Sequence, residues 1–191
     1  MGTNHMGRQS IRFPQPPVVR GFASVAGKKE REGPLGDQFT ATVQDTTFGE
    51  KSWERAERRM QQMTLELALE KAGLTDADLD AAFAGDLLNQ CIGSSFSLRN
   101  RGVPTLGLYG ACSTMAESLL LAAMSVSGGY ARTALAMTSS HFASSERQYR
   151  FPLGYGGQRT PTSQWTVTGA GAVLLGGGER GIRITAATIG S

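Results

Sequence analysis

The segment that most restricts the fold of this chain is a run of small residues joining an apolar strand pattern directly to an apolar helix pattern. Leu106–Gly110 has the pattern of an apolar strand, and a helix that begins no later than Ser113 and includes Glu117–Val126 follows it at once. A tight strand-to-helix turn requires small side chains. The segment therefore predicts an α/β fold in which Cys112 lies beside the first turn of a helix.

The other elements alternate between strand and helix patterns. Ser52 has the position of an N-terminal cap for a helix that runs to about Ala72, and Gly73 follows where a helix C-terminus favours glycine. Asp86–Gln90 follows a predicted strand, at the sheet end where open α/β sheets bind ligands. The predicted strands are Val18–Val25, Ala81–Gly85, Leu106–Gly110, Thr133–Thr138, Trp165–Leu175 and Gly181–Ile189, and a short helix covers Cys91–Arg99.

Two connections have distinct patterns. The glycines of Gly176–Gly178 predict a hairpin turn between the last two strands. Ser139–Thr162 is rich in Ser, Gly, Pro, Tyr and Arg, and we expect it to be a long loop. A loop of this length in a compact domain usually has a function.

Composition excludes several classes of function. The chain is 40% hydrophobic with a formal charge of +3, and no Lys or Arg stripe alternates with aromatic residues, so we expect no nucleic-acid binding. Two cysteines and two histidines do not supply a tetrahedral zinc site, and we expect neither a metal nor a cofactor. The longest apolar stretch, around Ser118–Val126, is too short to span a bilayer. Met1–Met6 has the character of an expression leader, which leaves residues 7–191 as the domain.

Three segments carry a resemblance to known proteins. GLYGACSTMAESLLLAAMSVSGG (107–129) resembles the nucleophile segment of the thiolase and β-ketoacyl synthase superfamily, and TGAGAVLLGGG (168–178) resembles its closing hairpin, with Thr168 where Asp is typical. Thr138–Leu175 and GDLLNQCIGSSFSLR (85–99) are similar to the stage V sporulation protein AD family within that superfamily. The resemblance implies the first half only of a thiolase-like α/β fold, with a mixed, mainly parallel sheet and helices on both faces.

The resemblance also implies a ligand, partners and a location. The ligand is dipicolinic acid (pyridine-2,6-dicarboxylate), free or as its calcium chelate, taken up into the developing spore. The partners are other stage V sporulation membrane proteins and a second copy of the chain, paired through the strand Thr133–Thr138. The location is the cytoplasmic face of the forespore inner membrane, with peripheral attachment.

A planar dianion requires cations, helix N-terminal amides and an aromatic face. Cys112 lies at a helix N-terminus, where an anion is favoured, and the long loop supplies Arg and aromatic side chains. For His141, a hydrogen-bonded structural role is the alternative to ligand binding. The candidate ligand-binding residues are Cys112, His141, Arg150, Tyr155, Gln158, Arg159 and Trp165.

Two other functions remain open. The first is a thiolase-type acyltransferase that uses Cys112 as its nucleophile. Acyl-transferring members take a catalytic His, Asn or second Cys from the second half of the fold, so we do not expect this chain alone to be an enzyme. The second is a scaffold that keeps the fold for assembly. A small cysteine packed behind a turn would fit that function.

Overall fold

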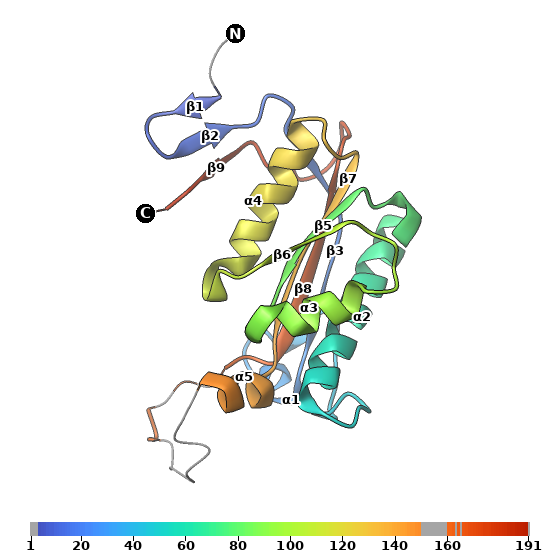
Figure 1. Ribbon diagram of the computed structural model, residues 1–191, viewed down its shortest axis with the longest axis vertical. Helices are drawn as coiled ribbons and strands as arrows, with labels where there is room; N and C mark the ends of the chain where they lie inside the picture. The colour runs from blue at the N-terminus through green and yellow to red at the C-terminus, as the bar shows by residue number, and fades with distance from the viewer. Residues whose placement is uncertain (1–3, 150–159, 163, 165, 191) are drawn as a thin grey trace.

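A six-stranded mixed sheet forms the centre of the molecule in the computed structural model, which describes residues 4–149, 160–162, 164 and 166–190 (Figure 1). The strand order is β4-β3-β8-β7-β5-β6, with parallel pairs β3–β4, β5–β6 and β5–β7 and antiparallel pairs β3–β8 and β7–β8. Helices cover both faces, which confirms the predicted fold class. The strands are β3 (Val18–Ala26), β4 (Ala41–Thr42), β5 (Ala81–Gly85), β6 (Thr105–Leu108), β7 (Thr133–Ser140) and β8 (Gly169–Gly176).

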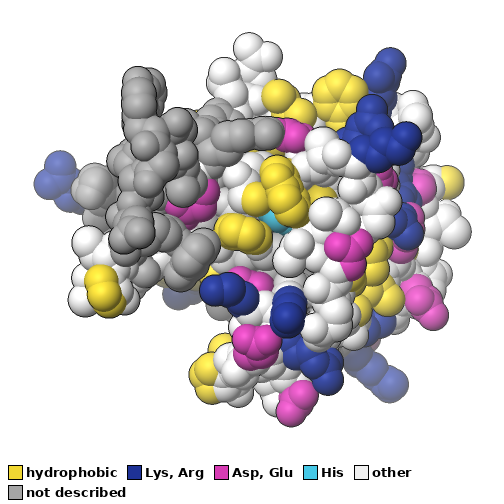
Figure 2. Space-filling model, turned by 90° about the horizontal axis from the view of Figure 1, so that it is seen from below, with side chains coloured by type: hydrophobic (Ala, Val, Ile, Leu, Met, Phe, Trp, Pro, Cys, Tyr) yellow, Lys and Arg dark blue, Asp and Glu magenta, His cyan; other side chains and the backbone are white. Residues whose placement is uncertain are grey.

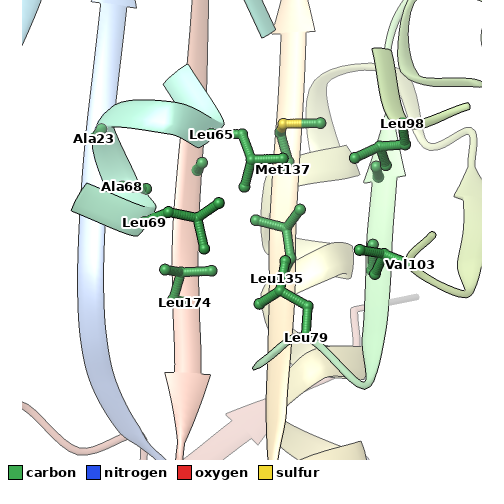
Figure 3. Packing of buried hydrophobic residues seen from close by; sticks show 13 residues of the cluster. Ala23, Leu65, Ala68, Leu69, Leu79, Leu98, Val103, Leu135, Met137 and Leu174 are labelled. Carbon is green, nitrogen blue, oxygen red and sulfur yellow. The ribbon is translucent and has the colours of Figure 1, made fainter. Parts of the chain in front are cut away.

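One face of the sheet is covered by α2 (Trp53–Ala72) and α3 (Ile92–Leu98) (Figure 1). The predicted caps of α2 are confirmed: the Ser52 side chain accepts a hydrogen bond from the Arg55 amide, and Gly73 is left-handed with φ of 63°. The apolar side of α2 packs on strands β3, β8 and β7 (Figure 3). Helix and sheet approach closely at Gly21, where an added Cβ would lie 2.8 Å from the Ala68 carbonyl oxygen.

The other face is covered by α4 (Thr114–Ser127), whose Ala122 and Ala123 are fully buried. Beside α4 lies a small antiparallel sheet of β1 (His5–Met6), β2 (Ser10–Arg12) and β9 (Ala186–Thr188) (Figure 1). The short helix α1 (Lys28–Arg31) lies in the segment after β3. No helix in the part of the chain that the structure describes is long and apolar enough to cross a membrane.

Three predictions were wrong, each for a topological reason. β9 does not form a hairpin with β8, because β3 and β7 occupy both edges of β8; it pairs with β2 instead. The predicted loop Ser139–Thr162 begins with the end of β7 and then a helix, α5 (Phe142–Tyr149). Strand β7 has β5 on one side and β8 on the other, so it has no free edge for a partner chain.

Candidate functional site

The turn between β6 and α4 is a strained elbow. Ala111 begins a short 3-10 turn, Ala111–Ser113, with φ of 49°, a conformation that L-residues seldom adopt. The Ser113 hydroxyl donates to the Gly110 carbonyl at 2.7 Å, which ties the turn back on itself. Cys112 is exposed within this turn, and Ser113 separates it from the start of α4. The predicted position of Cys112 at the strand-to-helix turn is confirmed.

A second strained loop lies opposite, between β5 and α3. Gln90 and Cys91 are consecutive left-handed residues, with φ of 59° and 51°. The buried Asp86 carboxylate holds this loop: it accepts hydrogen bonds from the Leu88 amide at 2.9 Å and from the Ser94 amide and hydroxyl, each at 2.7 Å. Such strain persists only where the surrounding structure enforces it, and it clusters at functional sites.

The two loops, α5 and Thr166 border a cavity of about 340 Å³ that is partly open to solvent, at the carboxyl ends of the parallel strands β5 and β6. This volume is within the range of small-molecule sites. The hydroxyls of Tyr109 and Tyr149 both donate to the Leu87 carbonyl oxygen, so the two phenol rings meet at one wall. The lining residues are Leu87, Tyr109, Ala111, Ser145, Glu146, Tyr149 and Thr166.

The polar groups of the lining come from α5 and Thr166. Ser145 is 2% exposed, and its hydroxyl has no hydrogen-bond partner among the described residues. Glu146 is 3% exposed, and its Oε1 accepts a hydrogen bond from the Thr166 hydroxyl at 2.9 Å. A buried hydroxyl without a partner is uncommon, and this one belongs to a residue that lines the cavity.

Two of the candidate ligand-binding residues, Cys112 and His141, lie in the described part of the chain, and they differ in their exposure to solvent. Cys112 follows the cavity-lining Ala111 but is not itself among the lining residues. His141 is fully buried: its Nε2 lies 2.8 Å from the Thr46 carbonyl oxygen, and its Nδ1 accepts from the Ala143 amide at 3.2 Å. Because that geometry leaves only Nε2 to carry hydrogen, the ring is neutral, and burial lowers its pKa. The remaining candidates, Arg150, Tyr155, Gln158, Arg159 and Trp165, lie outside the described residues.

Among the residues that line the cavity from α5, sequence reasoning considered Tyr149 but missed Ser145 and Glu146, and it did not predict the helix. A usable signal was present, because Phe142, Ser145 and Tyr149 recur at the three- and four-residue spacing of one helix face. The polar composition of Ser139–Thr162 concealed that spacing. Figure 2, which looks at the molecule from below, shows basic and acidic side chains interspersed around an apolar centre on the coloured part of this face.

Solved structures with the same fold are known. A priming β-ketosynthase from the R1128 polyketide biosynthetic pathway superposes with a TM-score of 0.58 at 17% identity, over 92% of this chain and 54% of that one. The 3-oxoacyl-[acyl-carrier-protein] synthase III from Aquifex aeolicus VF5 superposes with a TM-score of 0.56 at 18% identity, over 86% and 55%. Identities this low establish the thiolase-like fold alone, about half of which this chain spans.

Sequence comparison is more specific. Stage V sporulation protein AD from Bacillus subtilis (strain 168) is 44% identical over 184 residues, which are 96% of this chain and 54% of the relative. The model of the protein family described as "Stage V sporulation protein AD" matches residues 7–191. This chain therefore belongs to the stage V sporulation protein AD family.

Proposed function

We propose that the protein of which this chain is a part acts in sporulation and binds dipicolinic acid in the cavity between α5 and the two strained loops. Family membership supports the sporulation role. The choice of this ligand rests on one observation. The phenol rings of Tyr109 and Tyr149 line the same cavity as Ser145, whose buried hydroxyl has no partner among the described residues. Aromatic faces suit a pyridine ring, and a hydroxyl donor suits a carboxylate.

Glu146 limits the form in which the ligand binds. Its buried carboxyl group lines the cavity and supplies oxygen atoms of the kind that Ca²⁺ binds. A calcium chelate of dipicolinate therefore suits this wall, because Ca²⁺ accepts carboxylate oxygens from more than one molecule. We therefore expect tighter binding of dipicolinate with calcium than without it.

Calorimetric titration of the full-length protein with dipicolinate, with and without calcium, tests the proposal. Ser145→Ala should weaken binding roughly tenfold or more, because one hydrogen bond to a charged group is lost. Ser127→Ala is the matched control, because the Ser127 hydroxyl is also buried without a partner but lies at the far end of α4. Absence of heat at millimolar ligand in both conditions would refute the proposal, as would equal affinities for the two variants.

A second candidate function, acyl transfer, is favoured by the exposure of the Cys112 thiol at the elbow. It predicts a covalent thioester on Cys112 after incubation of the full-length protein with acyl-coenzyme A. Mass spectrometry detects this adduct, and Cys112→Ala is the control. An unmodified Cys112 would exclude acyl transfer and leave dipicolinate binding unaffected.

The proposal extends to the assembly. We propose a homodimer that forms through β6, because β6 is an edge strand of the sheet among the described residues and its Leu106 is 52% exposed. Peripheral attachment at the cytoplasmic face of the forespore inner membrane, beside other stage V sporulation membrane proteins, belongs to the same proposal. Sedimentation of the full-length protein and of its Leu106→Lys variant tests the dimer: the wild type should sediment as a dimer and the variant as a monomer.

A further inference from the structure

A buried carboxyl group lies directly behind the cavity. Glu57 on α2 is fully buried. Its Oε1 accepts a hydrogen bond from the Ser139 hydroxyl of β7 at 2.7 Å, and its Oε2 lies 2.8 Å from the Ser144 hydroxyl of α5. Glu57 thus joins the helix behind the sheet to a central strand and to the helix that forms one cavity wall.

Counting hydrogens indicates that Glu57 is neutral in this arrangement. The Ser144 oxygen is 2.8 Å from Glu57 Oε2 and 3.0 Å from the His141 carbonyl oxygen, and both of these are acceptors when Glu57 is ionised. A hydroxyl has one hydrogen, so it satisfies one of the two. If Glu57 carries a proton on Oε2, Glu57 donates to Ser144 and Ser144 donates to His141, and every short contact is a hydrogen bond.

The charged surroundings favour the same state. The Asp86 carboxylate at the end of β5 is a like charge that acts on Glu57, and the His141 ring at the junction of β7 and α5 is neutral. α3 presents serine hydroxyls, and no Lys or Arg in the described ranges forms an ion pair with Glu57. Burial first, and then Asp86, raise the pKa of Glu57 to about 7.

The same hydrogen bonds continue to the opposite wall of the cavity. Gln61 donates to Ser139 at 2.6 Å and to Ser94 at 3.2 Å, and Ser94 donates to Asp86 at 2.7 Å. Asp86 in turn holds the loop that contributes Leu87. On the near side, Ser144 directly precedes the lining residues Ser145 and Glu146. A continuous chain of hydrogen bonds therefore connects the two walls of the cavity. Glu57 is the residue of this chain whose hydrogen bonds depend on whether it is protonated.

We propose that Glu57 is a positioning residue that couples ligand affinity to pH: as a neutral carboxyl it fixes α5 against the sheet and completes the cavity, and as a carboxylate it releases α5 and weakens binding. The proposal rests on the function proposed above, because it concerns the same cavity. Glu57 lines no wall and touches no ligand; it acts through Ser144.

Three measurements on the full-length protein test the switch, with Glu57→Gln as the variant that keeps a neutral donor and acceptor. Glu66→Gln is the control, because Glu66 is exposed on the same helix. The first measurement is calcium–dipicolinate calorimetry between about pH 6 and about pH 8. Wild-type affinity should fall by up to about tenfold per pH unit above the pKa of Glu57, and the affinity of Glu57→Gln should stay near the low-pH value.

The other two measurements need no ligand. The infrared C=O band of a protonated carboxyl should be present in wild type near pH 6, disappear towards pH 8 and be absent from Glu57→Gln. Amide hydrogen exchange of α5 should be faster in wild type than in Glu57→Gln when both are measured near pH 8, and equal near pH 6. Neither signal should change in Glu66→Gln.

The outcomes separate the two proposals. A titrating band with pH-independent wild-type affinity would overturn the coupling, and absence of the band would overturn the neutral carboxyl. If no variant binds dipicolinate at any pH, the proposed ligand is refuted. The switch is then decided by the exchange of α5, which must depend on Glu57 ionisation for the inference to stand.

Discussion

Replacing Glu57 by glutamine should change how the stability of the folded protein depends on pH. Burial raises the pKa of Glu57 from 4.5 to about 7, so the folded state binds a proton more tightly than the unfolded state does. Stability from this group is therefore complete below about pH 4.5 and is lost as pH rises to about 7. Glutamine cannot ionise, and its amide can donate to Ser144 while its oxygen accepts from Ser139.

The magnitude follows from the size of the shift. Each pKa unit corresponds to about 1.4 kcal/mol, so the change from 4.5 to about 7 removes about 3 kcal/mol of unfolding free energy from wild type across that range. Urea denaturation followed by circular dichroism at several pH values measures this loss. The difference between Glu57→Gln and wild type should grow in favour of the variant as pH rises, and then level off above about pH 7.

The experiment has one control variant and one result that would refute the reasoning. Glu66→Gln is the control, because Glu66 lies on the same helix but is exposed, and its ion pairs with Arg59 and Arg101 are at the surface, where such pairs contribute little to stability. Parallel curves for wild type and Glu57→Gln would show that Glu57 is ionised in the folded state throughout. In that case both the hydrogen count at Ser144 and the pH switch derived from it would be wrong.

Three further substitutions test other parts of the structure. Asp86→Ala should lower the unfolding free energy by about 3 kcal/mol or more in urea denaturation, because buried amide donors lose their acceptor. His141→Phe should make the protein less sensitive to acid. Burial lowers the pKa of His141, so the folded state loses stability as pH drops below about 6.5, where the unfolded chain binds the proton more readily. The melting temperature of the variant should therefore fall less on acidification than that of wild type. Gly21→Ala should lower stability by about 1–3 kcal/mol in a thermal melt, because its Cβ would contact the Ala68 carbonyl oxygen at 2.8 Å.

Local signals in the sequence were sufficient for the elements whose ends depend on short-range chemistry. Ser52 and Gly73 predicted both ends of α2 because capping is a property of a few neighbouring residues. Ala81–Gly85 was predicted at its observed bounds because a run of small apolar residues between polar turns suits a fully buried strand. The elbow at Cys112 was predicted because its small residues permit few other structures.

Features that depend on distant contacts were not predicted. The position of β7 inside the sheet follows from pairing with β5 and β8, and no pattern within Thr133–Ser140 distinguishes an inner strand from an edge strand. Similarly, α5 is polar along most of its length, and its Ser144 is buried in contact with Glu57 of a distant helix, which no pattern within α5 indicates. The elbow was therefore predicted, but the α5 wall of the cavity beside it was not.

Protonation of Glu57 would favour an anionic ligand through two separate effects. Besides fixing α5, it removes one negative charge from an end of the sheet that also contains Asp86 and Glu146. The field of a buried charge reaches the cavity with little screening when salt is low, and added salt weakens only its longer-range part. The positional effect is a change of packing and hydrogen bonding, so salt should leave it unchanged. If the ratio of affinities near pH 6 and pH 8 persists at about 1 M salt, the movement of α5 dominates, whereas a ratio that collapses would assign the pH dependence to charge alone.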